Sequence, residues 1–148
     1  MEIDLENRQG LSFLGKTASG ACIEIGPPSA DPKLTSPMEL VLEALAGCSS
    51  VDVLAILAKQ RARVTAYRVR VVGLRDDASP HVSPFSRIEL EYRVDTDAPE
   101  HKVVRAVELS LEKYCSVAKM LESTVRICAA VTVNGRRVYP EPEDAAAE

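Results

Sequence analysis

The chain has 148 residues, of which 46% are apolar and 27% charged, and this balance indicates one soluble globular domain with a sizeable core. Its formal charge of -4, its four Tyr and two Phe, and its lack of Trp argue against a nucleic-acid-binding protein. The two histidines, His81 and His101, lie too far apart for a zinc-ligand spacing, so we expect no metal site.

The first ten residues, MEIDLENRQG, are acidic and contain no apolar signal segment, so we expect a cytoplasmic protein. In that compartment the four cysteines are more often reactive or buried than disulfide-bonded. We expect a single domain over residues 1–140, followed by an acidic, alanine-rich tail over residues 141–148.

Residues 1–26 predict two short strands, because apolar residues alternate in short segments that glycines separate. The segments are Glu2–Glu6, Leu11–Leu14 and Ala21–Ile25. Within the last of these, Cys22 is interpreted as an ordinary small strand residue. Residues 26–33 contain three prolines and form the loop that leads to the next element.

A long helix is predicted over Ser36–Arg61. Ser36, Pro37 and Glu39 form a capping box with proline at the first helical position. The segment is apolar around most of its circumference, which indicates a buried helix, and its Glu, Asp, Lys and Ser content argues against a membrane span. At about 1.5 Å per residue the helix would be about 39 Å long. One small domain is too short to cover it, so we expect a homodimer.

Two strands follow the helix. Val64–Leu74 and Phe85–Val94 alternate with a period of two and are expected to form an antiparallel pair around the turn at residues 76–84. His81 in that turn is expected to be a solvated loop residue.

The remainder of the chain predicts two helical segments and a last strand. A second capping box at Asp97 and Glu100 starts one helix. The segment EKYCSVAKMLES at residues 112–123 either continues this helix or forms a second short helix that begins near Cys115. The last strand, Thr124–Val133, carries Cys128 as an expected core residue. The order ββ–α–ββ–αα–β predicts an α+β fold with helices packed on antiparallel sheet.

Cys48 and Cys115 are the candidates for chemistry, since no nucleotide-binding, hydrolase-elbow, metalloprotease or CxxC motif is present. Gly47 and the serines beside Cys48 thin the packing of an apolar helix and would admit a substrate. A buried, inert Cys48, with Gly47 allowing close helix contact, is the alternative. A helix start and Lys113 favour a Cys115 thiolate, whereas Asp52, one turn after Cys48, disfavours a thiolate there.

Two motifs together, SPMELVLEALAGCSSVDV at residues 36–53 and EKYCSVAKML at residues 112–121, resemble the OsmC/Ohr family of thiol-dependent hydroperoxide reductases. The sequence is most similar to the OsmC-like branch, and the resemblance covers nearly the whole chain. It implies an OsmC-like fold, with antiparallel sheets packed on a long central helix, in an intertwined homodimer. It also implies a peroxidatic Cys48, a resolving Cys115 and no cofactor.

The resemblance also locates residues that would activate the thiol. The best-studied family members begin this helix with Asn-Pro-Glu, and that glutamate pairs with an activating arginine. Here Met38 stands at the glutamate position, and the adjacent Glu39 is turned by about 100° around the helix. Arg8 and Lys16 are the candidates for the basic residue. Ser116 stands where many members have proline after the second cysteine.

The function that the resemblance implies is reduction of an organic hydroperoxide in oxidative or osmotic stress defence. Cys48 would become a sulfenic acid, Cys115 would condense with it to a disulfide, and an external dithiol would restore both thiols. Apolar Leu45, Val51 and Met120 would favour a small hydrophobic substrate. A non-catalytic module that binds an apolar ligand or partner in the dimer cleft is the alternative, and a structural dimer with inert thiols is the least favoured hypothesis.

Overall fold

A computed structural model of the protein describes residues 1–75 and 82–140. The chain divides into two compact units, Met1–Val41 and Leu42–Glu148, and each is described by itself. A single domain over residues 1–140 stays a prediction. The turn residue His81 and the acidic tail over residues 141–148 lie outside the described residues.

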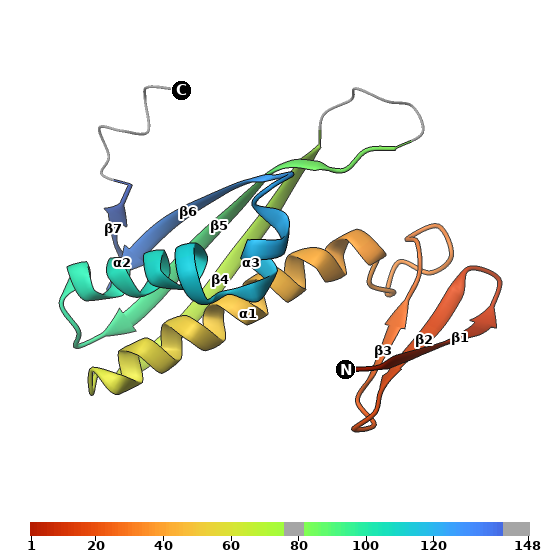
Figure 1. Ribbon diagram of the computed structural model, residues 1–148, viewed down its shortest axis with the longest axis horizontal. Helices are drawn as coiled ribbons and strands as arrows, with labels where there is room; N and C mark the ends of the chain where they lie inside the picture. The colour runs from red at the N-terminus through yellow and green to blue at the C-terminus, as the bar shows by residue number, and fades with distance from the viewer. Residues whose placement is uncertain (76–81, 141–148) are drawn as a thin grey trace. The chain divides into compact units, whose positions relative to one another are not determined.

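The N-terminal unit is a three-stranded antiparallel sheet in the order β1 (Ile3–Gln9), β2 (Ser12–Thr17) and β3 (Cys22–Ile25) (Figure 1). The sequence predicted two strands here, and the structure corrects this to three. The glycines at positions 10 and 20 adopt positive φ at the two turns, so each glycine reverses the chain rather than interrupting one strand. All residues of β1 are exposed, including the apolar Ile3 and Leu5.

The long helix α1 (Pro37–Lys59) starts as predicted. The backbone N–H of Ser36 donates to Glu39 Oε2 at 2.8 Å, and the N–H of Glu39 donates to Ser36 Oγ at 3.3 Å, which is the reciprocal pairing of a capping box. The helix ends two residues before the predicted Arg61. Arg61 has a φ of 61°, and this left-handed conformation stops the helix.

The second unit contains a four-stranded sheet in the order β4 (Val64–Arg75), β5 (Phe85–Thr96), β6 (Arg126–Val133) and β7 (Arg136–Tyr139). The antiparallel β4–β5 pair is confirmed. The β5–β6 pair is parallel, which corrects the expectation of wholly antiparallel sheet. The helical segment between β5 and β6 returns the chain to the starting end of the sheet, as a parallel crossover requires. An Asn134-Gly135 turn adds β7, a strand that was not predicted.

That crossover consists of α2 (Glu100–Leu109), a π-helical turn η1 (Ser110–Tyr114) and α3 (Ser116–Leu121). The capping box predicted at Asp97 is wrong. Pro99 is the N-cap of α2 and makes no side-chain capping bond, while Asp97 Oδ1 accepts a hydrogen bond from the Arg63 N–H at 2.8 Å. Asp97 thus secures the start of β4 instead of a helix.

The core lies between one face of the four-stranded sheet and the helices α1 and α2, which cross that face in Figure 1. Alternation along β5 places apolar residues toward the helices and charged residues on the opposite face. The fully buried core side chains include Leu45, Val53 and Leu57 of α1, Ile88, Leu90, Tyr92 and Val94 of β5, and Val103 and Val107 of α2.

The composition of α1 predicted burial on all sides, and the structure corrects this prediction. Its buried residues are Leu45, Ser49, Val53 and Leu57, which face the sheet. Another face carries exposed small and apolar residues that recur at helical spacing. We call this face the α1 stripe, and it consists of Ala44, Gly47, Val51, Leu54, Ala55 and Ala58.

The helix α1 has 23 residues and two apolar faces, so by length and composition alone it is long and apolar enough to span a membrane. The core helices of soluble proteins qualify in the same way. Composition therefore does not exclude a membrane span, contrary to the sequence argument. The buried face of α1 packs on the protein's own sheet, which favours a core helix.

Candidate active site

The structure brings together Cys48, Asp52 and Cys115. Cys48 and Asp52 are four residues apart and lie on one face of α1, and Cys115 is the N-cap residue of α3. The two sulfur atoms and a carboxylate oxygen of Asp52 all lie within 4.8 Å of one another. Both cysteines are free thiols. Residues that are 67 positions apart in the sequence thus share one site, as the cysteine motifs predicted.

The π-helical turn η1 positions Cys115. The Cys115 N–H donates to the Ser110 carbonyl at 2.7 Å, which closes the wider turn. Ser110 is buried, and its hydroxyl oxygen lies 3.2 Å from both the Ser49 carbonyl and Asp52 Oδ2. The single hydroxyl hydrogen can donate to either acceptor. Ser110 therefore holds the turn before Cys115 against the part of α1 that carries Cys48.

Two tyrosines of the sheet complete the polar surroundings. The Tyr92 hydroxyl donates to Ser49 Oγ at 2.8 Å, and burial raises the pKa of that hydroxyl, an effect that this bond partly offsets. The Tyr67 hydroxyl is buried and, within the described residues, meets no partner in hydrogen-bond geometry. Burial raises the pKa of Tyr67 to about 12, with a small opposing effect from the Ser50 hydroxyl.

Sequence reasoning missed Ser49, Ser110 and Tyr92 as functional residues. The serines looked like small spacers, and Tyr92 like one more apolar residue of a strand. Asp52, in contrast, was a candidate site residue from the sequence, since a spacing of four residues from Cys48 on a helix places both side chains on one face.

The two thiols differ in exposure. Cys48 is half-buried, whereas Cys115 is completely buried. Burial raises the pKa of the Cys115 thiol from 9.0 to about 11, opposed by the Ala118 N–H and reinforced by Cys48. The Ala118 N–H lies 3.4 Å from the sulfur atom. The predicted Cys115 thiolate is therefore wrong, because burial outweighs the favourable effects at the start of α3.

The other predicted activating residues have structural partners of their own. Glu39 is an exposed capping residue, and its hydrogen bonds with Ser36 hold the pKa of its carboxyl below the usual value. In the N-terminal unit, Arg8 and Lys16 each form an ion pair with Glu6 at 3.5 Å. Met38 is half-buried in the first turn of α1.

The expected apolar lining is only partly available within one chain. Leu45 is completely buried in the core and offers no surface to a ligand, whereas Val51 and Met120 are 69% and 70% exposed. Of the remaining cysteines, Cys22 is exposed. Cys128 is half-buried and lies opposite Glu89 on the charged face of the sheet, so its predicted place in the core is wrong.

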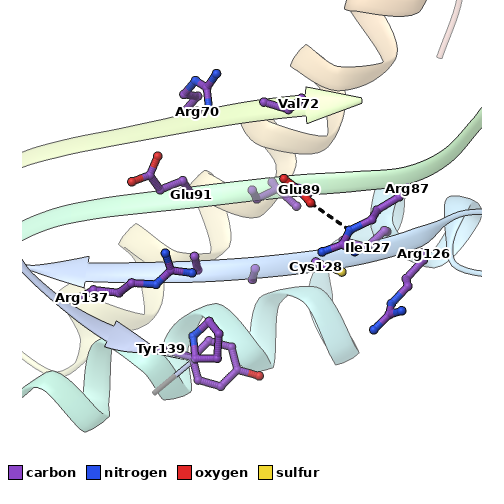
Figure 2. Close-up of a pocket in the computed structure, with 14 residues that line it drawn as sticks. Arg70, Val72, Arg87, Glu89, Glu91, Arg126, Ile127, Cys128, Arg137 and Tyr139 are labelled. Carbon is purple, nitrogen blue, oxygen red and sulfur yellow. Dashed lines mark ion pairs between the residues drawn. The ribbon is translucent and has the colours of Figure 1, made fainter. Parts of the chain in front are cut away.

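A hollow of about 590 Å³ lies on that charged face, and it contains none of the predicted site residues (Figure 2). Arg70, Arg87, Arg137 and Glu91 line it, and the Arg87 Nε pairs with Glu89 Oε1 at 2.9 Å. Charged walls of this kind do not suit an apolar substrate. The hollow is therefore separate from the cysteine site.

Comparison with known families identifies the fold. The sequence profile described as "OsmC-like protein" matches residues 30–129, which include both site cysteines. The chain belongs to the OsmC-like protein family. A curated relative, Protein YhfA of Escherichia coli K12, is 46% identical over 120 residues, which cover 80% of this chain and 87% of the relative.

Solved structures agree with this OsmC-like assignment. A hypothetical protein from Aquifex aeolicus VF5 is 34% identical, with a TM-score of 0.77 over 90% of this chain and 96% of the other. The organic hydroperoxide resistance protein OhrB of Bacillus subtilis is 17% identical, with a TM-score of 0.62 over 89% of this chain and 98% of the other, and shows the shared fold. The α+β, OsmC-like fold is therefore confirmed.

The raised pKa of Cys115 predicts a pH-dependent stability of this OsmC-like protein. Because the folded protein binds the thiol proton more tightly, the stabilisation is complete below pH 9.0 and is lost as the pH rises to about 11. We expect the free energy of unfolding of the reduced protein to fall more steeply over this range than that of Cys115→Ala. Urea denaturation at one fixed protein concentration measures both slopes.

The difference between the two proteins isolates Cys115, because Tyr67 and Tyr92 titrate in both. Equal slopes for the wild-type protein and the variant would show that Cys115 is not a protonated, buried thiol.

Proposed function

We propose that this protein is a thiol-dependent peroxidase that reduces organic hydroperoxides to alcohols, with Cys48 as the peroxidatic and Cys115 as the resolving residue. One observation carries the proposal: two free sulfur atoms from distant segments lie within 4.8 Å of each other. A sulfur–sulfur bond of about 2.05 Å needs only a local approach from this separation.

The exposure of the two thiols supports this order. A hydroperoxide can reach the half-buried Cys48, but not the completely buried Cys115. Cys115 is also protonated at neutral pH, because its pKa is raised to about 11. A buried thiol suits the second step, in which the electrophile is already attached to its neighbour.

The reaction has three balanced steps. The Cys48 thiolate attacks the distal oxygen of ROOH, the O–O bond breaks, and the alkoxide takes a proton to leave as the alcohol, so that Cys48 is a sulfenic acid. Cys115 attacks that sulfur and gives the disulfide and water. An external dithiol then reduces the disulfide by exchange and becomes oxidised itself.

In this proposal Asp52 is the base for the second step. Cys115 must lose its proton to attack, and the Asp52 carboxylate lies within 4.8 Å of both sulfur atoms, a separation that one water molecule can bridge. The hydrogen bond from Ser110 orients that carboxylate. Asp52 would thus supply a carboxylate beside the two thiols.

We further propose that the protein acts in the cytoplasm as a homodimer, in oxidative or osmotic stress defence. Solved structures of the same fold include proteins named for organic hydroperoxide resistance. The α1 stripe supports the dimer, since Val51 is 69% exposed and a Cβ added at Gly47 would meet nothing within 4 Å. A second copy of α1 could approach closely there and cover the apolar surface.

A second candidate is a non-catalytic module that holds an apolar ligand or partner in the dimer cleft. Met38 favours it, because a methionine cannot pair with an activating arginine. The exposed Val51 and Met120 would provide apolar contact surface.

Thiol counting separates the two candidates. On mixing the reduced protein with cumene hydroperoxide, we expect the loss of two thiols per chain, measured with a chromogenic disulfide reagent under denaturing conditions. Cys48→Ser is expected to retain its remaining thiols, whereas Cys128→Ser, the control, still loses two. Unchanged thiols in the wild-type protein, together with retention of a hydrophobic dye, would favour the binding module.

Asp52→Asn tests the proposed base. We expect disulfide formation to slow by about 10²-fold, since general base catalysis typically contributes 10²–10⁴-fold, while sulfenic acid formation keeps its rate. Rapid mixing followed by mass spectrometry resolves the two species. The isosteric amide preserves shape, and an unchanged rate of disulfide formation would exclude Asp52 as the base.

Val51→Asp tests the dimer. A charge in the α1 stripe would have to be desolvated in a helix–helix contact, so we expect a monomer in sedimentation equilibrium. Val82→Asp is the matched control, because Val82 is 67% exposed and lies outside α1. A wild-type monomer, or a dimer that Val51→Asp leaves intact, would contradict the proposed interface.

A further inference from the structure

The three groups of the cysteine site are all of metal-ligand type. Cys48, Asp52 and Cys115 each present one donor atom, and these atoms lie within 4.8 Å of one another. They form the only such group of His, Cys, Asp and Glu among residues 1–75 and 82–140. Sequence reasoning excluded zinc from the scarcity of histidines and did not consider a carboxylate beside two thiols.

The separations suit a tetrahedral ion. With Zn–S bonds of about 2.3 Å and Zn–O bonds of about 2.1 Å, the donor atoms of a tetrahedral site are about 3.6–3.8 Å apart. The three atoms therefore need to approach by roughly an ångström or less. Two of them are on one helix, four residues apart, so only Cys115 comes from a separate element.

The surroundings provide support for such a ligand set. The Ser110 hydroxyl lies 3.2 Å from Asp52 Oδ2, which leaves the second carboxylate oxygen for a metal. Hydrogen bonds of this kind orient ligands and raise metal affinity. Cys48 and Asp52 are both half-buried, so two of the three ligands are accessible to an ion, and only Cys115 is completely buried.

We propose that the reduced protein binds one Zn²⁺ ion per chain through Cys48 Sγ, a carboxylate oxygen of Asp52 and Cys115 Sγ, with water in the fourth position. Binding involves no change of oxidation state. The two thiols bind as thiolates, and their two protons pass to the solvent. An occupied site holds both sulfur atoms on the metal, so it protects them from oxidation and alkylation.

The donor set decides the choice of metal. Thiolates are soft ligands that Mg²⁺ and Ca²⁺ do not favour, and those ions need more oxygen donors than one carboxylate supplies. Cu(I) accepts thiolates but gains little from a carboxylate. Two thiolates with one carboxylate and one open position fit Zn²⁺.

The experiment uses the full-length reduced protein under argon, with a chromogenic chelator competing for Zn²⁺. We expect one Zn²⁺ per chain in the wild-type protein and in Cys128→Ser, and no stoichiometric binding in Cys48→Ser or Cys115→Ser. Asp52→Asn should bind at least about tenfold more weakly. Stoichiometric binding that survives in Cys48→Ser or in Cys115→Ser, or an unchanged affinity in Asp52→Asn, would overturn the site.

A second measurement on the wild-type protein does not depend on the folding of a variant. We expect Zn²⁺ to protect the half-buried Cys48 from iodoacetamide while the exposed Cys22 stays reactive, as peptide mass mapping reports. Equal labelling of Cys48 with and without Zn²⁺ would overturn the proposal. Neither measurement uses a hydroperoxide, so Zn²⁺ binding and peroxidase activity stand or fall separately.

Discussion

The buried hydroxyl of Ser110 is the contact on which the geometry of the site depends. It lies 3.2 Å from a backbone carbonyl and from a carboxylate oxygen of α1, and the carbonyl of the same residue accepts the Cys115 N–H. The π-helical turn is thereby held to the helix one residue after Cys48. Since the turn adds a residue to the helical ring, Cys115 leaves the helix in an extended conformation and becomes the cap of α3.

The helix α1 has two apolar faces. One face packs on the inner side of the four-stranded sheet, where every second residue of β5 is buried. The other face, the α1 stripe, is exposed in the single chain. This double character explains why the composition of α1 predicted burial all round. It also explains how a helix of a small α+β protein can resemble a membrane span by composition.

The polar groups beside the sulfur atoms distinguish this site from a simple buried cysteine pair. A completely buried thiol keeps its proton, and the nearby charged group is the Asp52 carboxylate. The same two properties, a protonated thiol and an adjacent base, are useful both for resolving a sulfenic acid and for binding a thiophilic cation. The charged hollow across the sheet contains neither Cys48 nor Cys115, and four arginines and two glutamates are among the residues that line it.

The sequence alone determined the long capped helix, the β4–β5 pair and the α+β class, because each follows from local periodicity or local capping, and its two motifs singled out Cys48 and Cys115 as candidates. It misplaced Asp97, Cys128 and the direction of β6, and it missed β7, because those depend on which segments pair. It assigned Cys115 a thiolate, since nothing local reveals complete burial. Only the tertiary structure brought Asp52, Ser110 and Cys115 together, because hydrogen bonds between residues about 60 positions apart leave no local pattern in the chain.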